Sequence, residues 1–137
     1  MPVLVAINGQ CLGGGLEVAA AGHLLFAAPG AMMGQPEIKL AVFAPAASCL
    51  LPERIGQAQA EDLLFSGRSI TAEEALRIGL VTAIAEDPDK AALDYFDKNL
   101  ASVSASTCAL PCGPPGEMPC SGSGPSWPPW KRCTWWN

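Results

Sequence analysis

The sequence predicts an α/β protein in which short buried strands alternate with helices, followed by an irregular C-terminal segment. Two observations support the α/β part: brief apolar runs are bounded by turn residues, and alanine-rich stretches carry helix-capping signals. After about Ser106 the composition changes, with most of the prolines, all four tryptophans and no regular apolar period. We therefore expect a domain over residues 1–106 and an irregular Cys/Pro/Trp-rich segment over 107–137 that is not of native type.

The first half of the domain is expected to begin with a buried strand. Val3 to Ile7 is a continuous apolar run that ends in a turn at Asn8-Gly9. Residues 16–21 predict a helix, because leucine and alanine favour that conformation. Residues 24–28 predict a second short strand, and residues 32–37 a short strand leading into a loop rather than a helix.

The second half is expected to be mostly helical. Residues 58–65 predict one helix. Thr71 and Glu74 have the spacing of a capping box, which predicts another helix to about residue 78. Leu80-Val81 predicts a brief strand, and Asp87-Pro88 opens a last helix with proline near its first position.

Composition excludes several classes of protein. The chain has 137 residues, half of them hydrophobic, and a net charge of −5 with no Lys/Arg cluster, so nucleic acid is not an expected partner. Charged and polar residues interrupt every apolar stretch, and the start lacks the features of a signal peptide. We expect a soluble, cytoplasmic protein that does not enter a membrane.

The six cysteines do not indicate a metal site. Cys11 and Cys49 lie in apolar surroundings and are expected to be reduced and buried. The other four lie in the 107–137 segment without paired C-x-x-C spacing, far from the single histidine, His23. No metal ligand is predicted, and His23 is expected in a capping or core role at the end of the first helix.

Gly13-Gly14-Gly15 lies between a strand and a helix start, an arrangement that binds anions or partial negative charge. A P-loop is excluded because Leu16-Glu17 follows instead of Lys-Ser/Thr, and the dinucleotide pattern fits poorly. An oxyanion hole remains, with Glu17 three residues after Gly14. The simpler alternative is that Glu17 only complements the helix dipole, and the residues alone leave both possibilities open.

Glu37 is the second acid of interest. It could pair with Lys39 at the surface. Pro36 restricts its backbone, however, and apolar residues flank it. A charged group embedded between apolar runs more often has a function than not.

Several motifs together resemble the enoyl-CoA hydratase/isomerase (crotonase) family. They are Ile7-Asn-Gly9, Gly13-Gly-Gly-Leu-Glu17, Gly34-Gln-Pro-Glu37, Ser66-Gly-Arg68 and Glu74-Ala-x3-Gly79-Leu-Val81. Each piece alone is weak, but their order and separation are specific. The resemblance implies part of the ββα-superhelix of the ClpP/crotonase-like fold and, with the full fold present, a homo-oligomer that is a trimer or hexamer.

The resemblance also implies the chemistry of an acyl-CoA hydratase, a lyase. The amide of Gly14 would form half of an oxyanion hole, Glu17 would activate water, and Glu37 would deliver a proton to the substrate carbon. Substrate-binding positions would be Gly13, Pro36, Phe43 and Pro45. No cofactor is implied, because coenzyme A is part of the substrate. Two acids at these places favour hydration over isomerisation.

The stretch after Glu37 departs from the family pattern, because Ala41 to Ser48 lacks the usual glycines. A cyclic substrate is expected for that reason. The resemblance, carried further by residues 10–22 and 42–49, implies cyclohexa-1,5-diene-1-carbonyl-CoA of anaerobic benzoyl-CoA degradation as that substrate. The alternatives are a general enoyl-CoA hydratase or isomerase, and an inactive truncated fragment. The fragment alternative is an expectation from the family pattern, in which a long segment precedes the strand at Val3. That segment would supply the other oxyanion amide, and this sequence does not include it.

Overall fold

Two three-stranded sheets organise the computed structural model, which describes residues 2–103. The first sheet has the order β1-β3-β6, and all its neighbours run parallel. In the second, β2 pairs with β4 in parallel and β4 with β5 in antiparallel orientation. The strands are β1 (Leu4–Ile7), β2 (Gln10–Leu12), β3 (Leu24–Ala27), β4 (Met32–Gly34), β5 (Ser69–Thr71) and β6 (Ala83–Ile84).

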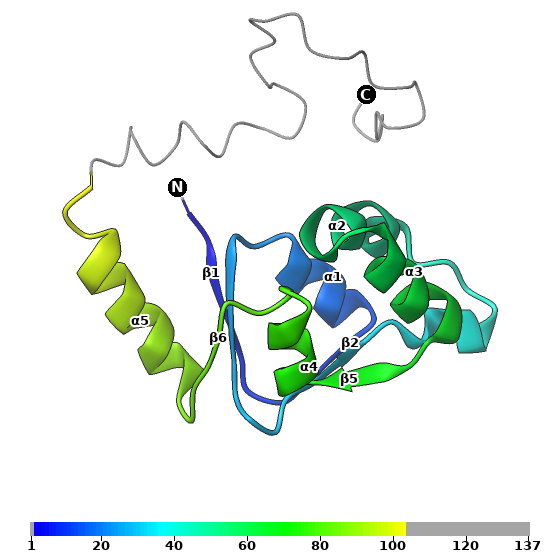
Figure 1. Ribbon diagram of the computed structural model, residues 1–137, viewed down its shortest axis with the longest axis horizontal. Helices are drawn as coiled ribbons and strands as arrows, with labels where there is room; N and C mark the ends of the chain where they lie inside the picture. Colours follow the sequence, from blue (N-terminus) through cyan, green and yellow to red (C-terminus); the bar gives the residue numbers. More distant parts are fainter. Residues whose placement is uncertain (1, 104–137) are drawn as a thin grey trace, which may run out of the picture.

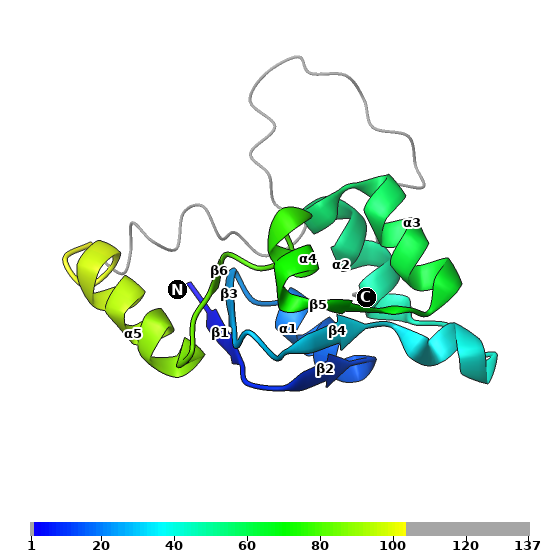
Figure 2. The same ribbon diagram turned by 60° about the horizontal axis from the view of Figure 1, so that its bottom comes forward.

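Helices cover the sheets from two sides (Figure 1). Helix α5 packs against β1 and β3, while α2 contacts both α1 and α3. Turned by 60°, the molecule shows α2, α3 and α4 on one side of the sheet that contains β2, β4 and β5 (Figure 2). The helices are α1 (Gly14–Ala20), the 3-10 helix η1 (Pro36–Leu40), α2 (Pro45–Ile55), α3 (Gln57–Ser66), α4 (Ala72–Arg77) and α5 (Pro88–Asn99).

The hydrophobic core joins the first strands to the helices that follow them. Its largest fully buried apolar side chains come from α1, β3, β4, α2, α3, β5 and the segment before β6. They are Leu16, Leu25, Met33, Leu51, Leu63, Ile70 and Leu80. This packing holds α1 against β2 and α2, which sets the positions of the residues around Gly13.

Local sequence signals correctly predicted most of the element boundaries. Thr71 caps α4 by accepting a hydrogen bond from the Glu74 amide at 3.3 Å. Asp87 caps α5 by accepting from the Lys90 amide at 2.9 Å, with Pro88 at the first helical position. The α/β class is confirmed.

Four expectations about local structure were wrong or incomplete. The strand expected at 32–37 ends at Gly34, and a 3-10 helix follows it instead of a loop. Leu80-Val81 is not a strand; both residues are buried, and β6 begins only at Ala83, where it can pair with β3. The capping box is only half formed, because the Glu74 carboxylate binds Arg68 at 2.8 Å instead of returning to the cap. Cys49 is half-buried rather than buried.

Helix α2 was not predicted, and Pro52 in its interior argues against a helix in sequence. Pro45 lies at the first helical turn, where a missing N–H is tolerated, and Pro52 lies inside the helix. The expected segment 107–137, with Cys108, Cys112, Cys120 and Cys133, lies outside the described residues.

Candidate active site

Gly13 forms the turn between β2 and α1. Its backbone has φ 57° and ψ −128°, a conformation that side chains disfavour and glycine adopts readily. Its N–H donates to the Gly34 carbonyl at 2.9 Å, and its carbonyl accepts from the Glu17 amide at 3.0 Å. The turn therefore ties the end of β4 to the first turn of α1.

The Glu37 carboxylate lies against Gly13. A Cβ atom placed on Gly13 would be only 2.5 Å from Glu37 Oε1. Glu37 Oε2 is buried and has no hydrogen-bond partner among residues 2–103. Burying a carboxylate oxygen without a hydrogen-bond donor costs free energy. Such an oxygen is therefore more typical of a functional group than of a structural one.

The alternative pairing of Glu37 with Lys39 is not formed. The ion pairs in the described part of the chain involve Arg68 and Arg77, with Asp62 and Glu74 as their partners. The stem of Lys39 instead lies over Gly67, with its Cε 3.2 Å from the position of a Cβ there.

Glu17 is held by an amide of α2. It lies in the first turn of α1, as the sequence indicated, and its Oε1 accepts from the Ala47 amide at 2.9 Å. Ala47 is in the first turn of α2, where amides have no partner within the helix. The role of this amide was missed, although Pro45 at a helix start was a signal that could have revealed it.

Gly14 begins α1 and is exposed, with open space around the position of its absent side chain. As the first helical residue, it has an amide without an acceptor four residues earlier in that helix. The Gly14 amide therefore lies next to the Gly13 backbone, which the Glu37 carboxylate approaches closely. It also lies about one helical turn before Glu17. The three groups singled out in the sequence are gathered around one turn.

A cavity of about 110 Å³ opens beside Glu37. It is mainly apolar, and Phe43 at its wall is 67% exposed. The predicted substrate-binding residues divide here: Phe43 lines the cavity, whereas Gly13, Pro36 and Pro45 do not. The lining residues are Gln35, Glu37, Ile38, Val42, Phe43, Ala44, Ser48, Leu64 and Phe65.

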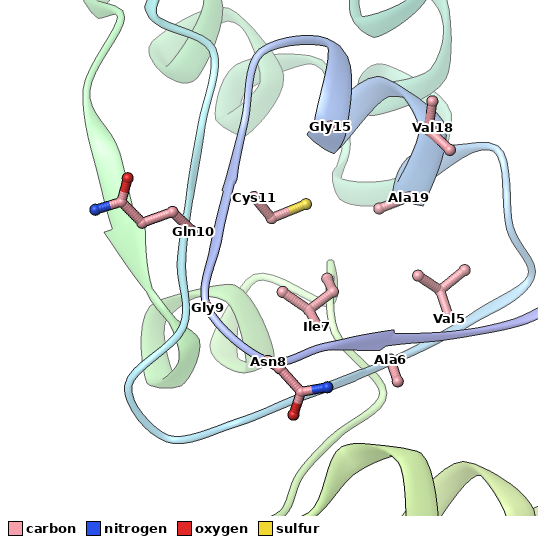
Figure 3. A pocket seen from close by; sticks show the side chains of 10 residues that line it. All are labelled: Val5, Ala6, Ile7, Asn8, Gly9, Gln10, Cys11, Gly15, Val18 and Ala19. Atoms are coloured by element: carbon pink, nitrogen blue, oxygen red, sulfur yellow. The ribbon is translucent and has the colours of Figure 1, made fainter.

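A second hollow of about 240 Å³ lies between β1, β2 and α1. Figure 3 shows the side chains of Val5, Ile7, Cys11 and Ala19 directed into it, while Gln10 points away. Burial raises the pKa of the Cys11 thiol, so this cysteine has the character of a small apolar side chain rather than of a nucleophile. Neither hollow is lined by Glu17.

His23 does not cap or fill the core. It is exposed, and its Nδ1 accepts from the Val3 amide at 2.9 Å, which ties the start of β1 to the residue before β3. Within residues 2–103 no group of three His, Cys, Asp or Glu side chains is arranged to hold a metal ion. None of the helices described has the length and apolarity needed to cross a membrane.

Comparison with known proteins identifies the family to which this fold belongs. The profile of the enoyl-CoA hydratase/isomerase family matches residues 1–102. The chain belongs to this family, and the described residues form part of its α/β fold.

Among characterised relatives, the cyclohexa-1,5-dienecarbonyl-CoA hydratase of Thauera aromatica is 69% identical over 107 residues, which are 78% of this chain and 42% of that protein. The (E)-benzylidenesuccinyl-CoA hydratase of the same organism is 45% identical over 62% of this chain and 34% of its own. The crystal structure of an enoyl-CoA hydratase/isomerase from Pseudoalteromonas atlantica matches with a TM-score of 0.75 and 33% identity. It covers 82% of this chain and 46% of that one. The chain thus spans less than half the length of these relatives.

Proposed function

We propose that the protein takes part in adding water to an unsaturated acyl-CoA thioester, with cyclohexa-1,5-diene-1-carbonyl-CoA as substrate. The product would be 6-hydroxycyclohex-1-ene-1-carbonyl-CoA. One water molecule is consumed and no electrons are transferred, so no redox partner is required. The observation that carries the proposal is the unpaired buried oxygen of Glu37 beside the Gly13 turn.

In this proposal each group at the turn has one task. The Gly14 amide donates to the thioester oxygen as that oxygen takes up negative charge, and a donor of this kind contributes about 2.7–4 kcal/mol in comparable sites. Glu17 accepts a proton from the attacking water. Its Oε1 is held by Ala47, while its Oε2 has no hydrogen bond within the described residues. Glu37 gives a proton to a ring carbon. The two carboxyl groups are treated as a coupled pair.

The walls of the cavity support a cyclic substrate. Phe43 and Phe65 are 67% and 72% exposed, and both line the space beside Glu37. A flat, unsaturated ring packs well against aromatic side chains. Pro36 and Pro45 are proposed to act on this wall indirectly, because they begin η1 and α2 on either side of it. The 69% identical relative is named as the hydratase of this ring thioester.

The proposed working form is a homo-oligomer, a trimer or hexamer, with residues 1–106 as the catalytic domain. Apolar side chains of η1 and the following loop support a further contact surface, since Leu40 is 76% and Val42 55% exposed. Light scattering of the purified chain tests this part. A monodisperse monomer would contradict it.

The activity is tested by incubating the full chain with cyclohexa-1,5-diene-1-carbonyl-CoA in ¹⁸O-labelled water. Product is separated by chromatography and its mass measured. The wild type should form labelled product, and Glu17→Gln and Glu37→Gln should each lower the rate at least about a hundredfold, in the range seen when catalytic acids are removed. Glu53→Gln is the matched control, because Glu53 is exposed on α2. Equal rates in all four proteins would refute the assignment.

A further inference from the structure

Gln35 is the one buried polar side chain in the core of the described residues, with 1% exposure. It lies between Gly34, which ends β4, and Pro36, which begins η1. A buried amide that makes few hydrogen bonds is destabilising, so its presence calls for a role.

The nitrogen of this amide binds the turn at Gly13. Gln35 Nε2 donates to the Gly13 carbonyl at 3.3 Å. The same carbonyl accepts from the Glu17 amide at 3.0 Å, so both of its acceptor positions are used. The reverse orientation of the amide would place two oxygens together, which fixes Nε2 as the atom that faces Gly13.

The Gly13 carbonyl and the Gly14 amide belong to one peptide unit. That unit is planar, and its C=O and N–H point in opposite directions when it is trans; no cis peptide occurs in the described chain. Two donors on the carbonyl therefore hold the direction in which the Gly14 N–H points. Hydrogen bonds to the carbonyl also polarise the peptide and strengthen its N–H as a donor.

The amide oxygen of the same side chain, Oε1, is in a different environment from the nitrogen. Gln35 Oε1 is buried without a hydrogen-bond donor among residues 2–103, as is Glu37 Oε2. Both residues line the cavity beside the turn. The Gln35 side chain thus binds the Gly13–Gly14 peptide through its nitrogen, and the residue also lines the cavity beside Glu37.

We infer that Gln35 is a positioning residue that aims the Gly14 amide at the thioester oxygen. The inference rests on the proposed function, which assigns that oxygen to Gly14. Gln35 itself needs no contact with substrate, because it acts through the Gly13–Gly14 peptide. It lies inside the Gly34-Gln-Pro-Glu37 motif, but sequence alone predicted no role for it in the site.

The test compares Gln35→Leu with Gln57→Leu in the full chain. Gln57 is an exposed glutamine whose Nε2 donates to Glu61, so it controls for the substitution itself. The readout is the carbonyl stretching frequency of bound crotonoyl-CoA carrying ¹³C at the thioester carbon. A stronger hydrogen bond to the thioester oxygen lowers this frequency. If the contact of Gln35 were purely structural, removing it would leave the frequency unchanged.

The wild type and Gln57→Leu should show the same lowered frequency, and Gln35→Leu should lose most of the lowering. Its kcat should fall about tenfold or more with little change in KM, as expected when a transition-state interaction is weakened. Full retention of both frequency and kcat in Gln35→Leu would overturn the inference. If Gln35→Leu fails to fold, Gln35→Met provides an unbranched replacement without a donor, and the same outcomes apply.

A ligand-free measurement separates this inference from the proposed function. The ¹⁵N resonance of Gly14 reports the hydrogen bonding of the Gly13 carbonyl in the same peptide. It should move in Gln35→Leu and stay unchanged in Gln57→Leu. If crotonoyl-CoA does not bind the wild type but the resonance moves, the proposed function fails while the contact that aims Gly14 stands. If the resonance does not move, the positioning role is wrong.

Discussion

Replacing Gly13 by alanine tests how closely the turn and Glu37 are fitted together. The new methyl group would lie 2.5 Å from Glu37 Oε1, whereas comfortable contact between heavy atoms needs about 3.5 Å. The carboxylate would have to retreat by about 1 Å. The backbone adds its own cost, because φ 57° is strained for alanine by about 1–3 kcal/mol.

The measurement is urea unfolding of Gly13→Ala beside Gly30→Ala. Gly30 has open space around its Cβ position and no positive φ, so its substitution should change stability by less than about 0.5 kcal/mol. Gly13→Ala should lower the unfolding free energy by about 1–3 kcal/mol or more.

Adding Glu37→Ala should recover part of that loss, with a coupling energy of about 0.5–3 kcal/mol as for residues in contact. Equal stabilities of Gly13→Ala and Gly30→Ala would refute the proposed fit between glycine and carboxylate. Strict additivity of Gly13→Ala and Glu37→Ala in the double variant would refute it as well.

Three further outcomes are expected. The hydrogen bond from Arg68 lowers the pKa of Glu74 from 4.5, so the stability from this pair is present above that pH and lost as the pH falls through the lowered pKa. Glu74→Gln should remove this component from a pH series of urea midpoints, and an unchanged profile would contradict it. Thr71→Ala and Asp87→Ala should each cost about 1 kcal/mol in urea unfolding, because each removes a helix cap; a loss near zero would count against those caps. Cys11 should be alkylated slowly by iodoacetamide in the folded chain and quickly in urea, as peptide mass mapping can show; rapid labelling of the folded chain would mean that the thiol is accessible.

The elements that sequence predicted well are those with local chemical signals. Caps at Thr71 and Asp87 mark helix starts because a side-chain oxygen satisfies an amide a few residues away. β2 and β5 were missed because each has only three residues and exists through pairing with β4. Nothing within such short segments distinguishes a strand from a loop.

Tertiary pairing also explains the misplaced last strand. Leu80-Val81 has the more strand-like composition, yet its residues are buried in the core, and the following Ala83–Ile84 reaches β3. Helix α2 was missed although Pro45 is a favourable first helical residue, because Pro52 inside the helix is a residue that normally ends one.

For the site, the sequence identified the charged members but not the groups that hold them. Glu17, Glu37 and the glycines stand out by residue type and spacing. The Ala47 amide that binds Glu17, and the Gln35 amide that binds Gly13, lie 30 and 22 residues from their partners. Such contacts depend on how α2 packs on α1 and how β4 pairs with β2. Only the folded chain brings them together.

The most direct test of the account is a crystal structure of the full chain with a bound, unreactive acyl-CoA thioester. The thioester oxygen should lie about 2.7–3.1 Å from the Gly14 nitrogen, with the reacting carbons facing Glu37 and room for a water molecule beside Glu17. A thioester bound elsewhere, or one whose oxygen points away from Gly14, would contradict the claim that the Gly13 turn gathers the hydration chemistry.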